Sequence, residues 1–179
     1  MGEIRRQRPV LLIAAVSSRH ESAIDSWTRE IASQSWGNIA LESEMFDFEE
    51  TRFYAASMGE NLKKKIFAFA DLIDPAQIAD TKILSNQWEI DFAHENQLPE
   101  KRPLNIDPGY VTEAKLVLAT TKDRDHRIYL RDGIFAEVTL HFTQGSWQTF
   151  RWTYPDYQRR DYHQFLANCR DYLRRRYVS

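Results

Sequence analysis

The stretch Val10-Leu11-Leu12-Ile13-Ala14-Ala15-Val16 contains no polar residue. A strand with one solvent face alternates apolar and polar residues, whereas a strand covered on both faces is apolar throughout. The run therefore predicts a central strand with packed layers on both sides. It is far shorter than the roughly 20 residues that span a membrane. No other stretch of the chain is long enough, so no membrane partner is expected.

Helix and strand signals alternate after this run, and caps and turn residues mark their ends. The expected elements are a helix from a capping box at Ser18–Glu21 to Gly37, a strand over 39–48, a short helix over 49–59, a strand over 66–71, a helix from Asp74-Pro75 to about His94, and a strand over 102–107 that ends at Pro108-Gly109. Together with the first strand, these elements follow the ferredoxin-like order β-α-β-β-α-β, with an antiparallel sheet and two helices on one side.

The helix that begins at Pro75 has an apolar face at helical spacing. Its members are Ala76, Ala79, Ile83, Ile90 and Ala93, with Asn86 on the same face and Glu89 at its edge. This face is expected to pack on the sheet.

The pattern of secondary-structure signals changes in the last third of the sequence. Asp132-Gly133 is a strong hairpin signal between strands over 126–131 and 134–142, and Gln144-Gly145 begins a second turn into 146–151. The segment 115–119 is either a helical turn or a strand. Apolar residues from Tyr162 to Leu173 mark an amphipathic terminal helix. We therefore expect one α+β domain over 1–179, a ferredoxin-like core extended by an antiparallel hairpin or meander and a terminal helix.

Composition excludes several classes of protein. The net charge of −2 provides no overall positive field to attract nucleic acid. Cys169 is the only cysteine, which excludes an internal disulfide and favours a cytoplasmic protein. The chain has six glycines and lacks the glycine-rich loops that cradle phosphates, as well as the common metal and serine-hydrolase motifs. The sequence thus specifies no cofactor, no metal site and no oligomeric state.

Asn105 and Asp107 form the first candidate site. They are two residues apart on the expected fourth strand, so both side chains point to one face, about 7 Å apart. An amide and a carboxylate beside a turn can hold a metal, a sugar hydroxyl or the edge of a base. The alternative is that Asn-x-Asp-Pro-Gly only makes the turn.

His126 and Glu137 form the second candidate site. A two-residue turn at Asp132-Gly133 pairs Ile128 with Glu137 and places His126 diagonally from Glu137, about 7 Å away between backbones. A histidine oriented by a carboxylate can act as a general base, and two histidines with a carboxylate can ligate a metal. The alternative is a solvent-facing polar sheet face, and a shift of one residue in register would abolish the arrangement.

Two further groups are candidates for binding. Thr120, Thr121, Lys122 and Arg127 place hydroxyl and cationic groups on adjoining loops, which suits either an anion pocket or a solvated loop. The aromatic residues between 147 and 157 either stack on nucleic-acid bases or pack in the core. The arginines near the C-terminus are most simply a solvated helix end.

The segments that carry these candidates resemble the bacterial domain of unknown function 4416 family, over about 9–177. The resemblance rests on Met58-Gly59, Asn86-x-x-Glu89, Asn105-x-Asp107-Pro108-Gly109-Tyr110, Leu118–Lys122, His126–Leu130, Ala136–Leu140 and Trp152–Tyr157. The family implies no established reaction or cofactor. Its polar signature coincides with the residues selected by spacing and includes Asn86 and Asp156.

Two functions follow as expectations. The first is an enzyme or degenerate enzyme that binds a small anionic ligand, phosphorylated or nucleotide-like. Its candidate catalytic residues are Asp107, His126 and Glu137, and its candidate substrate-binding residues are Asn86, Asn105, Thr121, Lys122, Arg127 and Asp156. The second is an RNA- or protein-binding module that uses the sheet aromatics and the C-terminal arginines. The first is favoured because polar residues converge from several segments beside turns.

Overall fold

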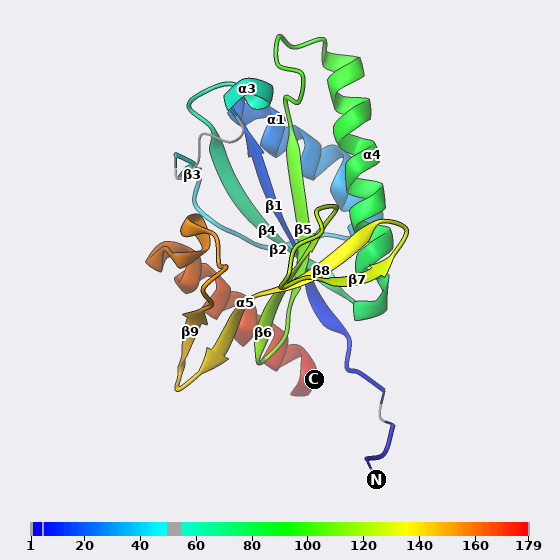
Figure 1. The fold of residues 1–179 in the computed structure, drawn as a ribbon, viewed down its shortest axis with the longest axis vertical. Helices are drawn as coiled ribbons and strands as arrows, with labels where there is room; N and C mark the ends of the chain where they lie inside the picture. Colours follow the sequence, from blue (N-terminus) through cyan, green and yellow to red (C-terminus); the bar gives the residue numbers. More distant parts are fainter. Residues whose placement is uncertain (1, 5, 50–54, 179) are drawn as a thin grey trace.

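The fold has three layers, with a sheet between two layers of helices (Figure 1). The computed structural model describes residues 2–4, 6–49 and 55–178. Its strands are β1 (Val10–Ser18), β2 (Ile39–Glu42), β3 (Phe46–Asp47), β4 (Lys63–Ile73), β5 (Asn105–Val111), β6 (Lys115–Thr120), β7 (Ile128–Arg131), β8 (Ile134–Thr143) and β9 (Ser146–Thr149). Its helices are α1 (Glu21–Ser26), which continues through a π-helical segment (Trp27–Ala32) into α2 (Ser33–Trp36), then α3 (Ala55–Met58), α4 (Ile78–Asn96) and α5 (Arg160–Val178), with short 3-10 turns at Pro75–Gln77 and Pro155–Gln158.

The sheet is antiparallel throughout, which confirms the α+β class. The strand order is β2-β4-β1-β5-β6-β8-β7, and β3 and β9 pair with β4 and β8 respectively. The segment 115–119, which the sequence left open, is a strand. None of the helices in the described residues is long and apolar enough to cross a membrane.

The first strand is covered on both faces, as its sequence predicts. Every residue of β1 is buried. Leu12 and Val16 pack with Trp27 in the core beneath α1 and α4, while Leu11 packs with Phe165 of α5 in the core on the other face. The continuous apolar run is therefore a consequence of its place in the middle layer.

Several expected element boundaries differ from the structure. The capping box at Ser18–Glu21 does not form, because the chain stays extended through Ser18, whose hydroxyl donates to the Pro103 carbonyl at 2.7 Å. The expected strand over 39–48 is interrupted between β2 and β3, where the Ser43 hydroxyl accepts a bond from the Ile66 N–H. Of the short helix expected over 49–59, only α3 is seen, and residues 50–54 lie outside the described residues.

The apolar face predicted for α4 is confirmed at Ala79, which is 1% exposed, and wrong at Ile83 and Ile90. Ile83 and Ile90 are 40% and 52% exposed, whereas Lys82, Ser85 and Glu89 are buried against the sheet. A helix that packs polar side chains inward needs buried polar partners, because an unpaired buried charge is unfavourable. For Lys82 and Glu89, these partners include Ile106 of β5.

β5 continues through Pro108-Gly109 instead of ending there, and this creates a gap in the sheet. The register between β5 and β6 stops at Gly109 opposite Leu118. Pro108 is the next residue along and has no N–H to donate, so the ladder cannot continue. Ile106 instead donates its N–H to Glu89 Oε1 at 2.7 Å and accepts from Lys82 Nζ at 2.7 Å. The polar inner face of α4 thus replaces the missing strand contacts.

Gly109 is required where β5 and β6 approach most closely. A Cβ at this position would lie 2.7 Å from Leu118 Cδ2 and closer still to the carbonyl oxygen of Val117. We expect Gly109→Ala to lower the free energy of unfolding by about 2–3 kcal/mol, measured by urea denaturation. The matched control is Gly145→Ala at a hairpin tip with open space around it, where the positive φ of 80° costs only about 1 kcal/mol. A larger loss at Gly145 than at Gly109 would contradict this account.

Candidate functional site

A cavity of about 320 Å³ opens at the gap between β5 and β6. It is bounded by α4 on one side and by the segment that leads into the 3-10 turn at Pro155–Gln158 on the other. Its lining residues are Phe48, Lys64, Lys82, Asn86, Arg102, Asn105, Asp107, Leu118–Lys122, Arg124, Arg127, Glu137 and Tyr154–Tyr157. Segments that are far apart in the sequence therefore meet at one place.

The cavity brings together nearly all of the residues predicted from the sequence. Eight of them line it: Asn86, Asn105, Asp107, Thr121, Lys122, Arg127, Glu137 and Asp156. His126 does not line the cavity but contacts Glu137. Four cationic lining residues were missed: Lys64, Lys82, Arg102 and Arg124.

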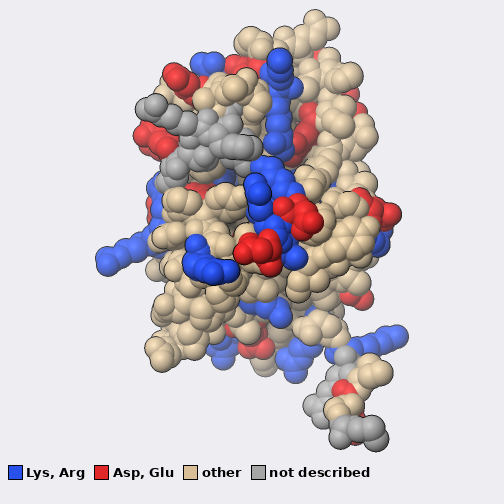
Figure 2. All heavy atoms as spheres, in the orientation of Figure 1, with Lys and Arg blue, Asp and Glu red and all other residues tan. Residues whose placement is uncertain are grey.

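Positive charge predominates at the cavity. Six lysine or arginine side chains and three carboxylates line it. Even if Glu89, which pairs with Arg102, is counted among the carboxylates, the cations exceed the anions by two. Figure 2 shows a band of Lys and Arg side chains running down the middle of this face of the molecule. The local field therefore differs in sign from the net charge of the whole chain.

Lys64 and Asp156 form a buried ion pair at the cavity. Lys64 Nζ lies 2.6 Å from Asp156 Oδ2, and the two side chains are 4% and 5% exposed. β4 supplies the lysine, and the 3-10 turn supplies the aspartate. The pair joins the sheet to the segment that covers the cavity.

Asp107 is an ionised carboxylate that faces the cavity. Its side chain is one-third exposed, with Oδ1 3.5 Å from Lys82 Nζ, while Oδ2 accepts from Asn105 Nδ2 at 2.8 Å. Burial opposes ionisation most strongly, but the charges of Lys82 and Lys64, the Asn105 hydrogen bond and Arg102 together outweigh it. The pKa of Asp107 is consequently lowered from its ordinary value. This group can accept hydrogen bonds from a ligand.

Glu89 links α4 to β5 at the side of the cavity. Its Oε2 accepts from Arg102 Nε and Nη2 at 2.9 and 2.6 Å, in addition to the Ile106 contact through Oε1. Burial raises the pKa of Glu89, although Lys82, Arg102 and the Ile106 N–H oppose the shift. Glu89 thereby orients the Arg102 side chain that lines the cavity.

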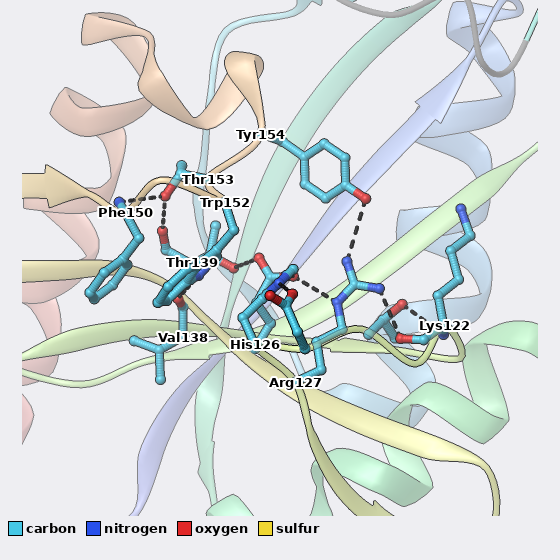
Figure 3. Close-up of polar contacts among 12 residues, drawn as sticks. Lys122, His126, Arg127, Val138, Thr139, Phe150, Trp152, Thr153 and Tyr154 are labelled. Atoms are coloured by element: carbon cyan, nitrogen blue, oxygen red, sulfur yellow. Dashed lines mark hydrogen bonds and ion pairs between the residues drawn. The ribbon is translucent and has the colours of Figure 1, made fainter.

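Glu137 is the centre of a second hydrogen-bonded group. Figure 3 shows this part of the structure, with His126, Arg127 and Tyr154 labelled. Its Oε2 accepts from Arg127 Nε at 2.8 Å and lies 3.1 Å from His126 Nε2, while Oε1 accepts from the Thr139 hydroxyl at 3.2 Å. Arg127 also donates to the Lys122 carbonyl and to the Tyr154 hydroxyl. Both oxygens of Glu137 are thus engaged within the protein, and the carboxylate fixes Arg127 and His126 in place.

The predicted contact between His126 and Glu137 exists, but the register that predicted it is wrong. Ile128 pairs with Ala136 and not with Glu137, because the pairing shifts between Tyr129 and Arg131. His126 lies in the loop before β7 and reaches Glu137 from there. A bulge, which a hairpin count does not include, accounts for the difference.

The aromatic residues near the C-terminus do not form an open platform. Trp147 and Tyr157 are 4% and 3% exposed. Trp152 is stacked between His126 and Phe150, with ring centroids 5.2 and 4.7 Å away. Within the described residues, no group of three or more His, Cys, Asp or Glu side chains is placed to hold a metal ion.

Comparison with known proteins identifies a family and nothing beyond it. No curated protein matches the chain. No solved structure matches it either. A family model described as Domain of unknown function (DUF4416) matches residues 8–172, and the chain belongs to this family.

Proposed function

We propose that the cavity binds a small anionic ligand, phosphorylated or nucleotide-like, and that the protein is an enzyme or degenerate enzyme acting on it. The observation that carries the proposal is the excess of cationic side chains around a cavity of ligand size. Phosphate groups are bound by glycine-rich loops and helix N-termini or by lysine and arginine side chains. Here side chains supply the charge, chiefly Lys122 and Arg124, because the Arg127 side chain is buried and paired with Glu137.

The geometry supports different roles for the three acidic and basic candidates. Asp107 faces the cavity as an ionised carboxylate, so it is the group able to accept a proton or a hydrogen bond from a ligand. Glu137 contacts both Arg127 and His126, and we assign Glu137 and His126 positioning roles. Asn86, Asn105 and Thr121 supply polar atoms at the wall.

We also infer a ferredoxin-like core. Its four strands would be β2, β4, β1 and β5, which are adjacent in that order and antiparallel. The two helices that connect them, α1–α2 and α4, contribute to one hydrophobic core on the same face of the sheet. The cavity would then lie where the added strands β6 to β8 join this core.

The proposed function is tested by isothermal titration calorimetry with inorganic pyrophosphate at low ionic strength. We expect saturable binding that weakens as salt is raised, because the contacts are between charged groups. Two controls distinguish recognition of charge from binding of any polar molecule. One is a series of titrations at increasing chloride concentration, and the other is a titration with uncharged glycerol. Absence of binding by pyrophosphate and by a panel of phosphate monoesters would contradict the proposal.

The charge state of Lys122 is expected to couple anion binding to pH. Burial lowers the pKa of Lys122, Asp107 partly opposes the shift, and positive charges nearby add to it. These charges belong to Arg102, Arg124 and Arg127. The pKa therefore lies below the ordinary lysine value of about 10.4.

A bound anion stabilises the ammonium form of Lys122 and raises its pKa, so binding should take up protons at alkaline pH. With a phosphate monoester, whose phosphate is fully ionised at alkaline pH, affinity should accordingly fall as pH rises through the lowered pKa. Calorimetry with that monoester at alkaline pH, in two buffers of different ionisation enthalpy, measures the uptake. Lys122→Met should abolish it, and equal uptake in that variant would show that another group titrates.

A further inference from the structure

The two ends of the cavity differ in exposure and chemistry. At the inner end, Lys64, Asn105, Asp156 and Tyr157 are each 3% exposed. The mouth is formed by the exposed residues Thr121, Arg124 and Tyr154, together with the half-buried Lys122. A ligand that fills the cavity would therefore meet cationic groups at the mouth and a different set of polar groups at the inner end.

Two buried hydroxyl groups near the inner end have no hydrogen-bond partner among the residues that the structure describes: Tyr157 OH and Ser17 Oγ. Tyr157 lines the cavity, whereas Ser17 does not. Ser17 lies opposite Lys64 on β4 and opposite Asn105 on β5, so its side chain is on the same face of the sheet as theirs.

The Tyr157 hydroxyl is a neutral hydrogen-bond donor. Its ring lines the cavity and packs edge-on against Tyr162, with centroids 5.6 Å apart. Burial, followed by the negative charges of Asp156 and Asp107, raises the pKa of Tyr157 well above its ordinary value. Buried hydroxyls in folded proteins normally have partners, so this donor points to a bound group that supplies one.

The inner end presents groups that can hydrogen-bond to hydroxyls. Asp107 offers a charged acceptor, and Tyr157 offers a neutral hydroxyl donor. One face of the Phe48 ring is covered by Lys64 Nζ, 3.8 Å from its centroid, and that face is closed to a stacked base.

We propose that the ligand is a phosphorylated sugar or polyol, with its phosphate at the mouth and its hydroxyls on Asp107 and Tyr157. The proposal rests on the proposed function, because it assigns the anionic group to the same cationic mouth. It adds that the second part of the ligand carries several hydroxyl groups.

Calorimetric titration of the full chain with three phosphate monoesters tests the inference: ribose 5-phosphate, n-butyl phosphate and AMP. The first two share the charged group and differ in hydroxyls, so ribose 5-phosphate should bind at least about tenfold more tightly. Equal affinity of these two would overturn the inference while leaving the proposed function intact. Binding of none of them would instead remove the proposed function. AMP binding more tightly than ribose 5-phosphate would assign the inner end to a base and would also overturn the inference.

A conservative variant locates the hydroxyl contact. Tyr157→Phe should weaken ribose 5-phosphate binding by about three- to tenfold and leave n-butyl phosphate unchanged. Tyr172→Phe, on α5, is the matched control and should change neither ligand.

Asp107→Asn should act on the two ligands in opposite directions. It removes a negative charge that repels phosphate, so n-butyl phosphate should bind more tightly. It also removes the charged acceptor, so ribose 5-phosphate should bind less tightly. A change in the same direction for both ligands would overturn the inference. Circular dichroism and thermal unfolding confirm that each variant is folded before it is titrated.

Discussion

Replacing Lys64 by methionine is expected to lower the free energy of unfolding by about 3–5 kcal/mol. The substitution leaves the Asp156 carboxylate, which is 5% exposed, without its ammonium partner at 2.6 Å. A buried charge that loses its partner costs far more than an intact pair contributes. Urea denaturation followed by circular dichroism measures the change.

Lys63→Met is the matched control for this prediction. Lys63 precedes Lys64 on β4, and its ion pair with Asp47 has the same length, 2.6 Å, but the side chains are 33% and 68% exposed. Solvent screens such a pair, so its loss should leave the unfolding transition nearly unchanged. The double variant Lys64→Met with Asp156→Asn should regain at least half of the lost stability, because it no longer buries an unpaired carboxylate. Equal effects of the two single lysine variants would show that burial of the Lys64 pair is unimportant.

Replacing both Lys122 and Arg124 by methionine is expected to weaken pyrophosphate binding at least about 100-fold. Each residue supplies a cationic donor at the mouth of the cavity, and hydrogen bonds to charged groups contribute about 1.5–3 kcal/mol each. Arg124 makes no side-chain hydrogen bond or ion pair with any other described residue, so its guanidinium is available to a ligand. Calorimetry at fixed low ionic strength measures the loss.

The control for this double variant removes one lysine and one arginine charge at positions that do not line the cavity. Lys115→Met with Arg174→Met removes one lysine and one arginine from exposed positions at the start of β6 and on α5. Its net charge equals that of the mouth variant, so any long-range effect of charge is matched. We expect affinity to stay within about threefold of the unmodified protein, since contacts at the mouth are retained. A similar loss in both double variants would mean that total charge, and not the mouth, determines binding.

The parts of the fold that depend on local patterns could be predicted from the sequence. The run Val10–Val16 identifies a strand covered on both faces, and Asp132-Gly133 identifies the hairpin between β7 and β8. Asp74-Pro75 begins the helical segment that leads into α4, with both hydrogen bonds of a capping box to Gln77 and its neighbours. Each of these signals acts within a few residues, so no knowledge of the tertiary structure is needed.

The inner face of α4 could not be predicted, because it depends on a gap in the sheet. Apolar periodicity favoured Ile83 and Ile90, but the helix buries Lys82 and Glu89. These side chains satisfy the N–H and C=O of Ile106, which have no partner strand. The local cause, Pro108 within a strand, is visible in the sequence and was read as the end of a strand.

The candidate site could be predicted only in part, because tertiary contacts place some of its residues. Residues beside turns, such as Asp107 and Lys122, were identified because loops carry function in many proteins. Lys64 was missed because it lies in the run Lys63–Lys65, where the alternation of a strand points one lysine inward and its neighbours outward. Which lysine is inward depends on the register with β1, and no pattern within the run reveals that register.

The most direct test of the cavity as an anion site is the anomalous diffraction of a crystal soaked in sodium tungstate, a tetrahedral dianion that mimics phosphate. We expect the strongest tungsten peak inside the cavity, within contact distance of Lys122, Arg124 or Arg127, and we expect pyrophosphate to displace it. A cavity without a tungsten peak, or a strongest peak on the arginines of α5 that pyrophosphate does not displace, would contradict the account.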